Sequence, residues 1–156
     1  MTNRILDGEI LDTRLDDDRL YDGVRTRRIL AFVLDYLIVG LLLIPFAILV
    51  LLLGLLTFGL GWMLFAVLAP LVALTYVWNT LGGRNQATVG MRIMGIRLER
   101  LDGQPVDGML AVVHSVLFWA GNAVLTPLVL LVTLFSDRKR TLHDLLLGTV
   151  VLRADR

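Results

Sequence analysis

The sequence contains no cysteine and only two histidines, His114 and His143. The absence of cysteine excludes a disulfide framework, a cysteine-ligated zinc ion and a cysteine nucleophile. The two histidines show no metal-ligand spacing, so we expect neither a metal nor another cofactor. The chain also lacks a surplus of either charge, since its formal net charge is +1. Its basic residues fall into three blocks separated by apolar runs, a pattern that does not indicate nucleic-acid binding.

Apolar residues are abundant and are gathered into three long runs. They make up 56% of the 156 residues, and the mean hydropathy is +0.75, whereas soluble domains contain about 45–50% apolar residues. The runs cover residues 29–56, 60–78 and 109–134. A helix needs about 20 apolar residues to cross about 30 Å of hydrocarbon. The pattern predicts an all-α polytopic membrane protein with two full transmembrane helices, over 29–56 and 60–78, whose main partner is the lipid bilayer.

The segment before the first run is polar and acidic. Residues 1–24 hold many aspartates and few apolar residues, so they cannot bury enough surface to offset the entropy of ordering, and we expect a mobile acidic arm. Residues 25–153 form the predicted membrane domain. The first run does not resemble a cleavable signal sequence, because it is much longer than the about 7–15 apolar residues of such a signal. We expect it to stay in the membrane.

The third apolar run differs from the first two because polar and helix-breaking residues interrupt it. His114, Ser115 and Asn122 lie within it, and Pro127 falls near its middle. Two interpretations fit: one broken, tilted span, or a re-entrant pair of short helices that returns to the side it left. Irregular backbone at membrane depth requires cover by protein or water.

The placement of charges predicts the orientation. Arginines precede the first run and occupy residues 79–108, whereas the loop 57–61 between the first two runs is uncharged. Basic residues favour the cytoplasmic side, so we expect the amino terminus and residues 79–108 to be cytoplasmic. Three complete crossings would place the basic residues 138–140 outside. We therefore expect the third run to turn back, so that the tail is cytoplasmic too.

Two short segments outside the apolar runs have the character of strands. Residues 96–100 alternate apolar and charged side chains and precede the turn dipeptide at 102–103, which predicts a small β-hairpin on the membrane surface. Residues 149–152 are largely β-branched. Their pairing with 96–100 would require both segments on one side of the membrane. Just before them, Thr141 is expected to cap a short helix that Gly148 ends.

One carboxylate, Asp35, lies within the first apolar run. A central aspartate costs a transmembrane helix about 2.5–3.5 kcal/mol, so it normally faces protein or a wet cavity. Arg28 lies two turns earlier on the same face, about 10 Å away along the helix axis. Two interpretations fit: Arg28 is a charge partner of a functional Asp35, or Arg28 only marks the cytoplasmic end and Asp35 stays hydrated near the interface.

Three motifs, in this order, resemble those of the RDD family of small prokaryotic membrane proteins, which is named for an arginine and two aspartates. They cover residues 28–35, residues 86–97 with the turn that follows, and residues 140–151. Together they extend over about 25–153. One departure is Met91, which stands where the family often has lysine. The motif residues that we single out are Arg28, Asp35, Gln86, Thr88, Arg140, His143 and Asp144.

The resemblance implies a small protein of the prokaryotic inner membrane, and for some members of the family cation/proton exchange has been proposed. In that case Asp35 would be the protonatable cation site, Arg28 its charge partner, and Asp144 a cytoplasmic gate or second partner. The ligands would be monovalent cations and protons. Because three hydrophobic segments are too few to enclose a pathway, the chain would form a homo-oligomer. The secondary site residues would be Gln86, Thr88, Arg140 and His143.

The alternative is a non-transporting structural or regulatory module that assembles with partner membrane proteins. Arg28, Asp35 and Asp144 would then form one charge cluster at the cytoplasmic interface, and the acidic arm would be a docking tail. An enzyme is the poorest interpretation. A catalytic set drawn from Ser115, His143 and Asp144 has no supporting nucleophile motif.

Overall fold

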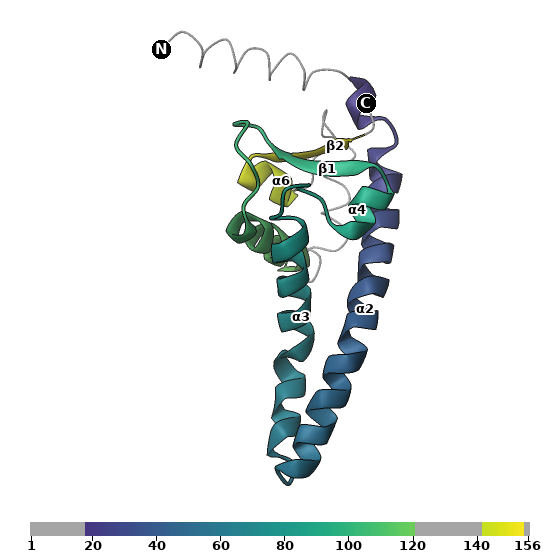
Figure 1. Ribbon diagram of the computed structural model, residues 1–156. Helices are drawn as coiled ribbons and strands as arrows, with labels where there is room; N and C mark the ends of the chain where they lie inside the picture. The colour runs from purple at the N-terminus through teal and green to yellow at the C-terminus, as the bar shows by residue number, and fades with distance from the viewer. Residues whose placement is uncertain (1–17, 121–141, 155–156) are drawn as a thin grey trace.

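A computed structural model describes residues 18–120 and 142–154. Two long helices, α2 (Val24–Leu56) and α3 (Phe65–Thr80), run side by side and meet at one end (Figure 1). A 3-10 helix, η2 (Leu60–Leu64), joins them. The predicted pair of long apolar helices is thereby confirmed, and both stretches, Arg19–Leu56 and Leu60–Thr80, are long and apolar enough to cross a membrane.

These helices are apolar on all sides and are poorly covered by the rest of the chain. Of their most apolar windows only 11% and 17% are buried within the protein. A helix that is apolar all round belongs either in the core of a large protein or in a membrane. Because little of this surface is buried here, its exposure favours lipid as the covering medium.

The turn between α2 and η2 is tight and depends on two glycines. Thr57 Oγ1 donates to the Leu53 carbonyl at 2.7 Å and accepts a hydrogen bond from the Gly61 amide at 2.8 Å. A Cβ on Gly61 would lie 2.7 Å from the backbone nitrogen of Gly54. Since that neighbour is backbone, it cannot give way as a flexible side chain would.

Replacing Gly61 with alanine is therefore expected to force the two helices apart at this end. We expect the free energy of unfolding to fall by about 1–3 kcal/mol, which is typical of overpacking, as measured by circular dichroism during titration with SDS. The matched control is Gly40→Ala on α2, where an added Cβ meets nothing within 4 Å. Equal stability of the two variants would contradict the close approach at Gly61.

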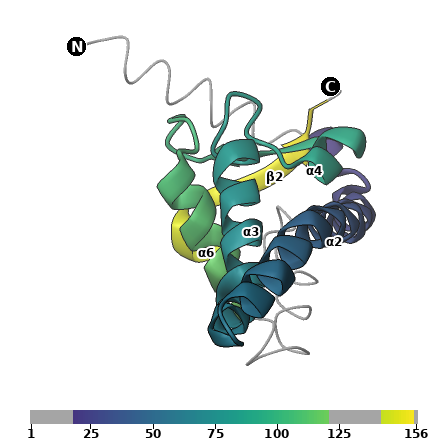
Figure 2. The same cartoon turned by 60° about the horizontal axis from the view of Figure 1, so that its bottom comes forward.

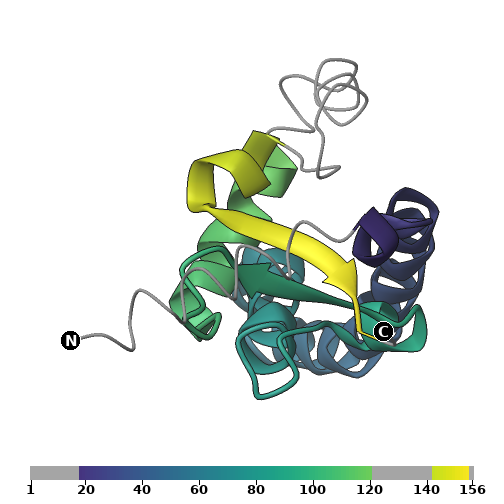
Figure 3. The ribbon, with the colours of Figure 1, turned by 90° about the horizontal axis from the view of Figure 1, so that it is seen from above.

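At the other end of the helix pair lies a cap built on a two-stranded antiparallel sheet (Figures 1 and 3). Strand β1 (Ile96–Arg100) pairs with β2 (Thr149–Arg153), with Ile96 opposite Arg153 and Arg100 opposite Thr149. Two short helices, α4 (Val89–Ile93) and α6 (Leu142–Leu147), and the apolar helix Gly108–Ala120 complete the cap. In Figure 2, where the bottom of the molecule comes forward, β2 passes behind α3.

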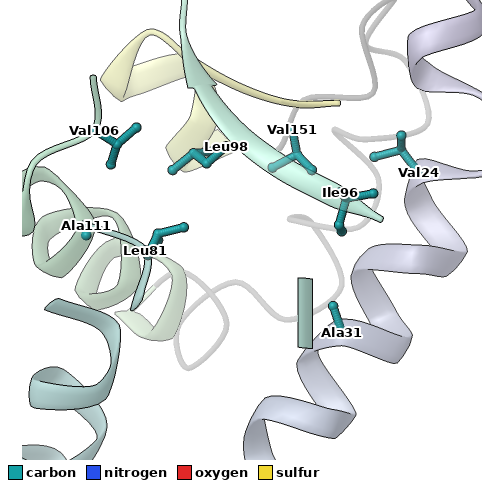
Figure 4. Packing of buried hydrophobic residues seen from close by; sticks show 8 residues of the cluster. All are labelled: Val24, Ala31, Leu81, Ile96, Leu98, Val106, Ala111 and Val151. Atoms are coloured by element: carbon teal, nitrogen blue, oxygen red, sulfur yellow. The ribbon is translucent and has the colours of Figure 1, made fainter. Parts of the chain in front are cut away.

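One buried cluster joins the cap to the long helices (Figure 4). Because alternate residues of a strand point to one face, β1 directs Ile96 and Leu98 together into this cluster, and each is 1% exposed. Side chains from α2, the end of α3, β2 and the helix Gly108–Ala120 meet them. The buried members are Val24, Ala31, Leu81, Ile96, Leu98, Val106, Ala111 and Val151.

The predicted hairpin at 102–103 is wrong, although the turn exists. Asp102 accepts hydrogen bonds from Arg100 and from the Gln104 amide, and Gly103 has a φ of 72°. The bond from Arg100 also holds the pKa of the Asp102 carboxyl below its usual value. The chain then leads through Pro105, which has no N–H to donate, into the helix at Gly108. The partner of β1 is β2 instead.

This pairing confirms that the tail lies at the same end of the molecule as the segment before Gly108. Gly148, with a φ of 61°, follows α6 as predicted. The third apolar run is helical from its start to Ala120. The choice between a broken and a re-entrant span, and the cap expected at Thr141, fall outside the described residues.

The end of the predicted acidic arm is packed rather than free. Residues Asp18–Tyr21 form a 3-10 helix, η1, and Leu20 and Tyr21 are buried against Val150 and Leu152 of β2. These two side chains bury apolar surface in a segment that was expected to bury very little. Residues 18–21 therefore belong with the cap, and residues 1–17 lie outside the described part of the chain.

Candidate functional site

The Asp35 carboxylate of α2 is held by three hydrogen bonds from two other elements. Its Oδ1 accepts from the Tyr76 hydroxyl of α3 at 2.6 Å and from the Gly90 amide of α4 at 2.8 Å. Its Oδ2 accepts from the Thr88 hydroxyl at 2.5 Å. All three donors are uncharged. The side chain thereby ties α2 to α3 and to the beginning of α4.

The two hydroxyls at Asp35 also cap α4. Thr88 Oγ1 accepts from the Met91 amide at 3.1 Å, and the Tyr76 oxygen accepts from the Val89 amide at 3.0 Å. The first amides of a helix have no partner within it, and here Val89, Gly90 and Met91 each find one in this group. A hydroxyl has a single proton, and both protons are directed at Asp35. The pattern therefore suits an ionised carboxylate, which only accepts.

Gly90 brings α4 directly against the backbone of α2. A Cβ at this position would lie 2.3 Å from the Ala31 carbonyl oxygen and 2.8 Å from the Asp35 carboxylate. Ala31 is one turn before Asp35 and is 2% exposed. Glycine is therefore required here for close approach, and any side chain would separate α4 from α2.

The length of α2 beyond Asp35 can be compared with the thickness of a bilayer. From Asp35 to the end of α2 at Leu56 the helix rises by about 32 Å, at 1.5 Å per residue. This length matches the about 30 Å of a hydrocarbon core. Asp35, with Tyr76 and Thr88 beside it, therefore lies about one hydrocarbon thickness from the Leu56 end of α2.

The second carboxylate, Asp144 of α6, is fully buried in the cap. Its Oδ2 lies 2.6 Å from the Arg28 guanidinium, whose side chain is 19% exposed. Its Oδ1 accepts from the Thr149 hydroxyl at 3.3 Å and lies 3.8 Å from His114 Nε2. The pair joins α2 to α6 and β2. A buried charge requires such a partner.

The three predicted residues therefore form two sites instead of one cluster. Arg28 binds Asp144, whereas the described contacts of Asp35 are with Tyr76, Thr88 and Gly90. Of the two interpretations of Arg28, the described contacts do not include its pairing with Asp35, which lies two turns farther along α2, because α6 places Asp144 in direct contact with Arg28.

The structure describes only some of the predicted secondary site residues. Thr88 belongs to the Asp35 site, and Gln86 contributes its carbonyl, which accepts from the Leu98 amide of β1 at 2.9 Å. Arg140 and the side chain of His143 fall outside the described residues. Tyr76 was not predicted, although a hydroxyl near the end of an apolar run is a usable signal. Within the described ranges, no group of three histidine or carboxylate side chains could hold a metal ion.

The comparison with protein families confirms the resemblance to the RDD family. Residues 23–148 match the family described as the RDD family. Neither the comparison with curated proteins nor that with solved structures gives a match.

Proposed function

From the premise that the chain belongs to the RDD family, we propose that it is a multi-pass membrane module with a structural or regulatory role, in which two carboxylates fasten a cytoplasmic cap to a transmembrane helix pair. The cell membrane would be the prokaryotic inner membrane. The arginines of the cap and of the start of α2 support a cytoplasmic location for this end, because basic residues favour the cytoplasmic side of a membrane. Copies of the chain, or other membrane proteins, would cover its exposed apolar helices.

The observation that carries this proposal is that both carboxylate oxygens of Asp35 already accept hydrogen bonds. Its two oxygens accept three hydrogen bonds from within the chain. A cation would have to displace those donors, whose hydrogens point at the place it would take. A site that binds and releases ions needs acceptor atoms with room for the ion. The same bonds are what a fastening between α2, α3 and α4 requires.

Cation/proton exchange is the second candidate, and one observation favours it. Asp35 is the single charged residue of the apolar run 29–56, and the hydroxyls of Tyr76 and Thr88 could reorient to accept a hydrogen bond from its protonated carboxyl. Exchange by such a small chain would still require oligomerisation to enclose a pathway.

Replacement of Asp35 by asparagine and by leucine separates the two functions. The amide oxygen of asparagine can accept from Tyr76 and Gly90, and its NH₂ can donate to Thr88 Oγ1. We expect Asp35→Asn to fold with a loss of about 1 kcal/mol, and Asp35→Leu to lose about 2–3 kcal/mol because buried donors stay unpaired. SDS titration in detergent measures both.

The activity measurement uses the same variants in vesicles. Under the structural proposal, wild-type protein shows no proton flux driven by sodium or potassium gradients. The complex purified in mild detergent has a larger mass than one copy of the chain, because it contains further copies or a partner protein. Flux in the wild type that disappears in the folded Asp35→Asn variant would instead establish exchange and overturn the structural role.

A further inference from the structure

The helix Gly108–Ala120 lies across the long axis of α2 and α3. Seen from above in Figure 3, this green helix is drawn along its length, whereas α2 and α3 are seen more nearly end-on. Its first residue packs on the end of α3. A Cβ on Gly108 would lie 2.5 Å from the Trp78 ring, and a Cβ on Gly82 would lie 2.4 Å from the Gly108 Cα.

The other end of this helix packs on α2 through aromatic rings. Trp119 stacks on Tyr36, with ring centroids 6.4 Å apart. Phe118 lies against Phe32, with ring centroids 5.6 Å apart. The helix therefore begins at α3 and reaches α2 at its end.

Both of these contacts lie at one level along the helix pair. The level is that of the hydrogen bond between Tyr76 and Asp35, because Trp78 follows Tyr76 closely on α3 and Tyr36 is next to Asp35 on α2. This level is about one hydrocarbon thickness from the Leu56 end of α2. From its first to its last residue the crossing helix is about 20 Å long, so it is also too short to span about 30 Å of hydrocarbon.

The two sides of this helix have different surroundings. Ala111 is 0% exposed within the buried cluster, and His114 lies 3.8 Å from a carboxylate of α6, so this side packs on the cap. Met109, Val113 and Val116 are spaced four and three residues apart and lie on the opposite side. There they are 64%, 38% and 48% exposed. These three residues form what we call the outer stripe.

We propose that the helix Gly108–Ala120 lies in the plane of the membrane and that its outer stripe binds phospholipid acyl chains next to their headgroups. This inference rests on the proposed function and adds the region of the lipid that this surface binds. The whole helix lacks Asp, Glu, Lys and Arg. Helices that lie on a membrane usually carry basic residues on their polar face, but here that face is packed on the cap.

The surroundings of the outer stripe favour lipid as its occupant. The stripe continues into the exposed apolar surface of α2, because Trp119 stacks on Tyr36, which is itself 61% exposed. Tryptophan and tyrosine are enriched at the level of the headgroups. A stacked pair of these two residues at the end of the helix agrees with a position at the boundary between headgroups and acyl chains.

The absence of cysteine allows the depth of single positions to be measured in the full chain. Met109→Cys, Val113→Cys and Val116→Cys are each labelled with a nitroxide and placed in phosphatidylcholine vesicles. Electron paramagnetic resonance compares collisions with oxygen, which is concentrated in hydrocarbon, and with a water-soluble nickel chelate. We expect all three labels to be open to oxygen and to lie within about 3 Å of one depth, which is half a helical turn.

The matched control is a pair of positions on α2. Leu41 and Ile48 are also exposed and are also seven residues apart. The labels of Leu41→Cys and Ile48→Cys should therefore differ in depth by about 10 Å. A helix Gly108–Ala120 that stood upright would produce the same difference between Met109→Cys and Val116→Cys.

Three outcomes overturn the proposal. One is a depth difference of about 10 Å along the outer stripe. Another is greater access of the nickel chelate than of oxygen, which would place the stripe in water. The third is immobilised labels with dipolar broadening, which would identify a contact with a second copy of the chain. In each case the α2 control pair can still show its difference in depth, so the proposed membrane module fails only if that pair is open to the chelate instead of oxygen.

Discussion

Replacing Arg28 with alanine is expected to lower the free energy of unfolding by about 3–5 kcal/mol, the cost of removing one member of a buried ion pair. The Asp144 side chain is 0% exposed, so water cannot replace the guanidinium that lies 2.6 Å away. The Thr149 hydroxyl, at 3.3 Å, and His114 Nε2, at 3.8 Å, both lie farther from the carboxylate than the guanidinium does. SDS titration followed by circular dichroism measures the loss.

The controls for this prediction separate buried from exposed charge. Arg100→Ala removes an arginine from an exposed pair with Asp102, and such pairs contribute about 0–1 kcal/mol. Adding Asp144→Asn to Arg28→Ala should restore part of the stability, because the buried carboxylate charge is gone. A loss for Arg28→Ala no larger than that for Arg100→Ala would show that the buried pair does not hold the cap.

Replacing Gly90 with alanine is expected to cost about 3–4 kcal/mol. The added Cβ would overlap the Ala31 carbonyl, and overpacking alone costs about 1–3 kcal/mol. Moving α4 away from α2 would also break the bond from the Gly90 amide to Asp35, which leaves buried groups unsatisfied at about 1–3 kcal/mol. SDS titration reports the total.

Hydrogen exchange makes this second prediction specific to α4. The amides of Val89 and Met91 should exchange faster in Gly90→Ala, since their acceptors, Tyr76 and Thr88, are positioned by the same contact. The same change at Gly40, which faces open space, should leave those amides protected. Unchanged protection in Gly90→Ala would contradict the close packing of α4 on α2.

The elements that depend on local pattern could be predicted from the sequence. The two long helices follow from apolar length, and both strands follow from alternation and β-branching, with β1 at Ile96–Arg100 and β2 one residue longer than expected. These features need only neighbouring residues. The same reasoning led to the wrong hairpin prediction. A turn dipeptide predicts that the chain reverses locally, but it does not predict which strand pairs with β1.

The partners of the charged residues could not be predicted, because they come from distant parts of the chain. Asp35 and Tyr76 are 41 positions apart, and Arg28 and Asp144 are 116 apart. Spacing along α2 suggested Arg28 with Asp35, since both lie on one face. The docking of α4 and α6 on α2 determines which partner each charged residue has. Gly90 allows α4 to dock, but a glycine has no side chain from which this role could be predicted.

The pairing of β1 with β2 has a consequence for how the protein is made. Strand β1 leaves the ribosome long before β2, because the chain between Arg100 and Thr149 must be synthesised first. Until then the edge of β1 offers unpaired amides and carbonyls to any nascent neighbour. The sheet can close only once Thr149–Arg153 has been synthesised, so a premature stop before Thr149 leaves the long helices without a finished cap.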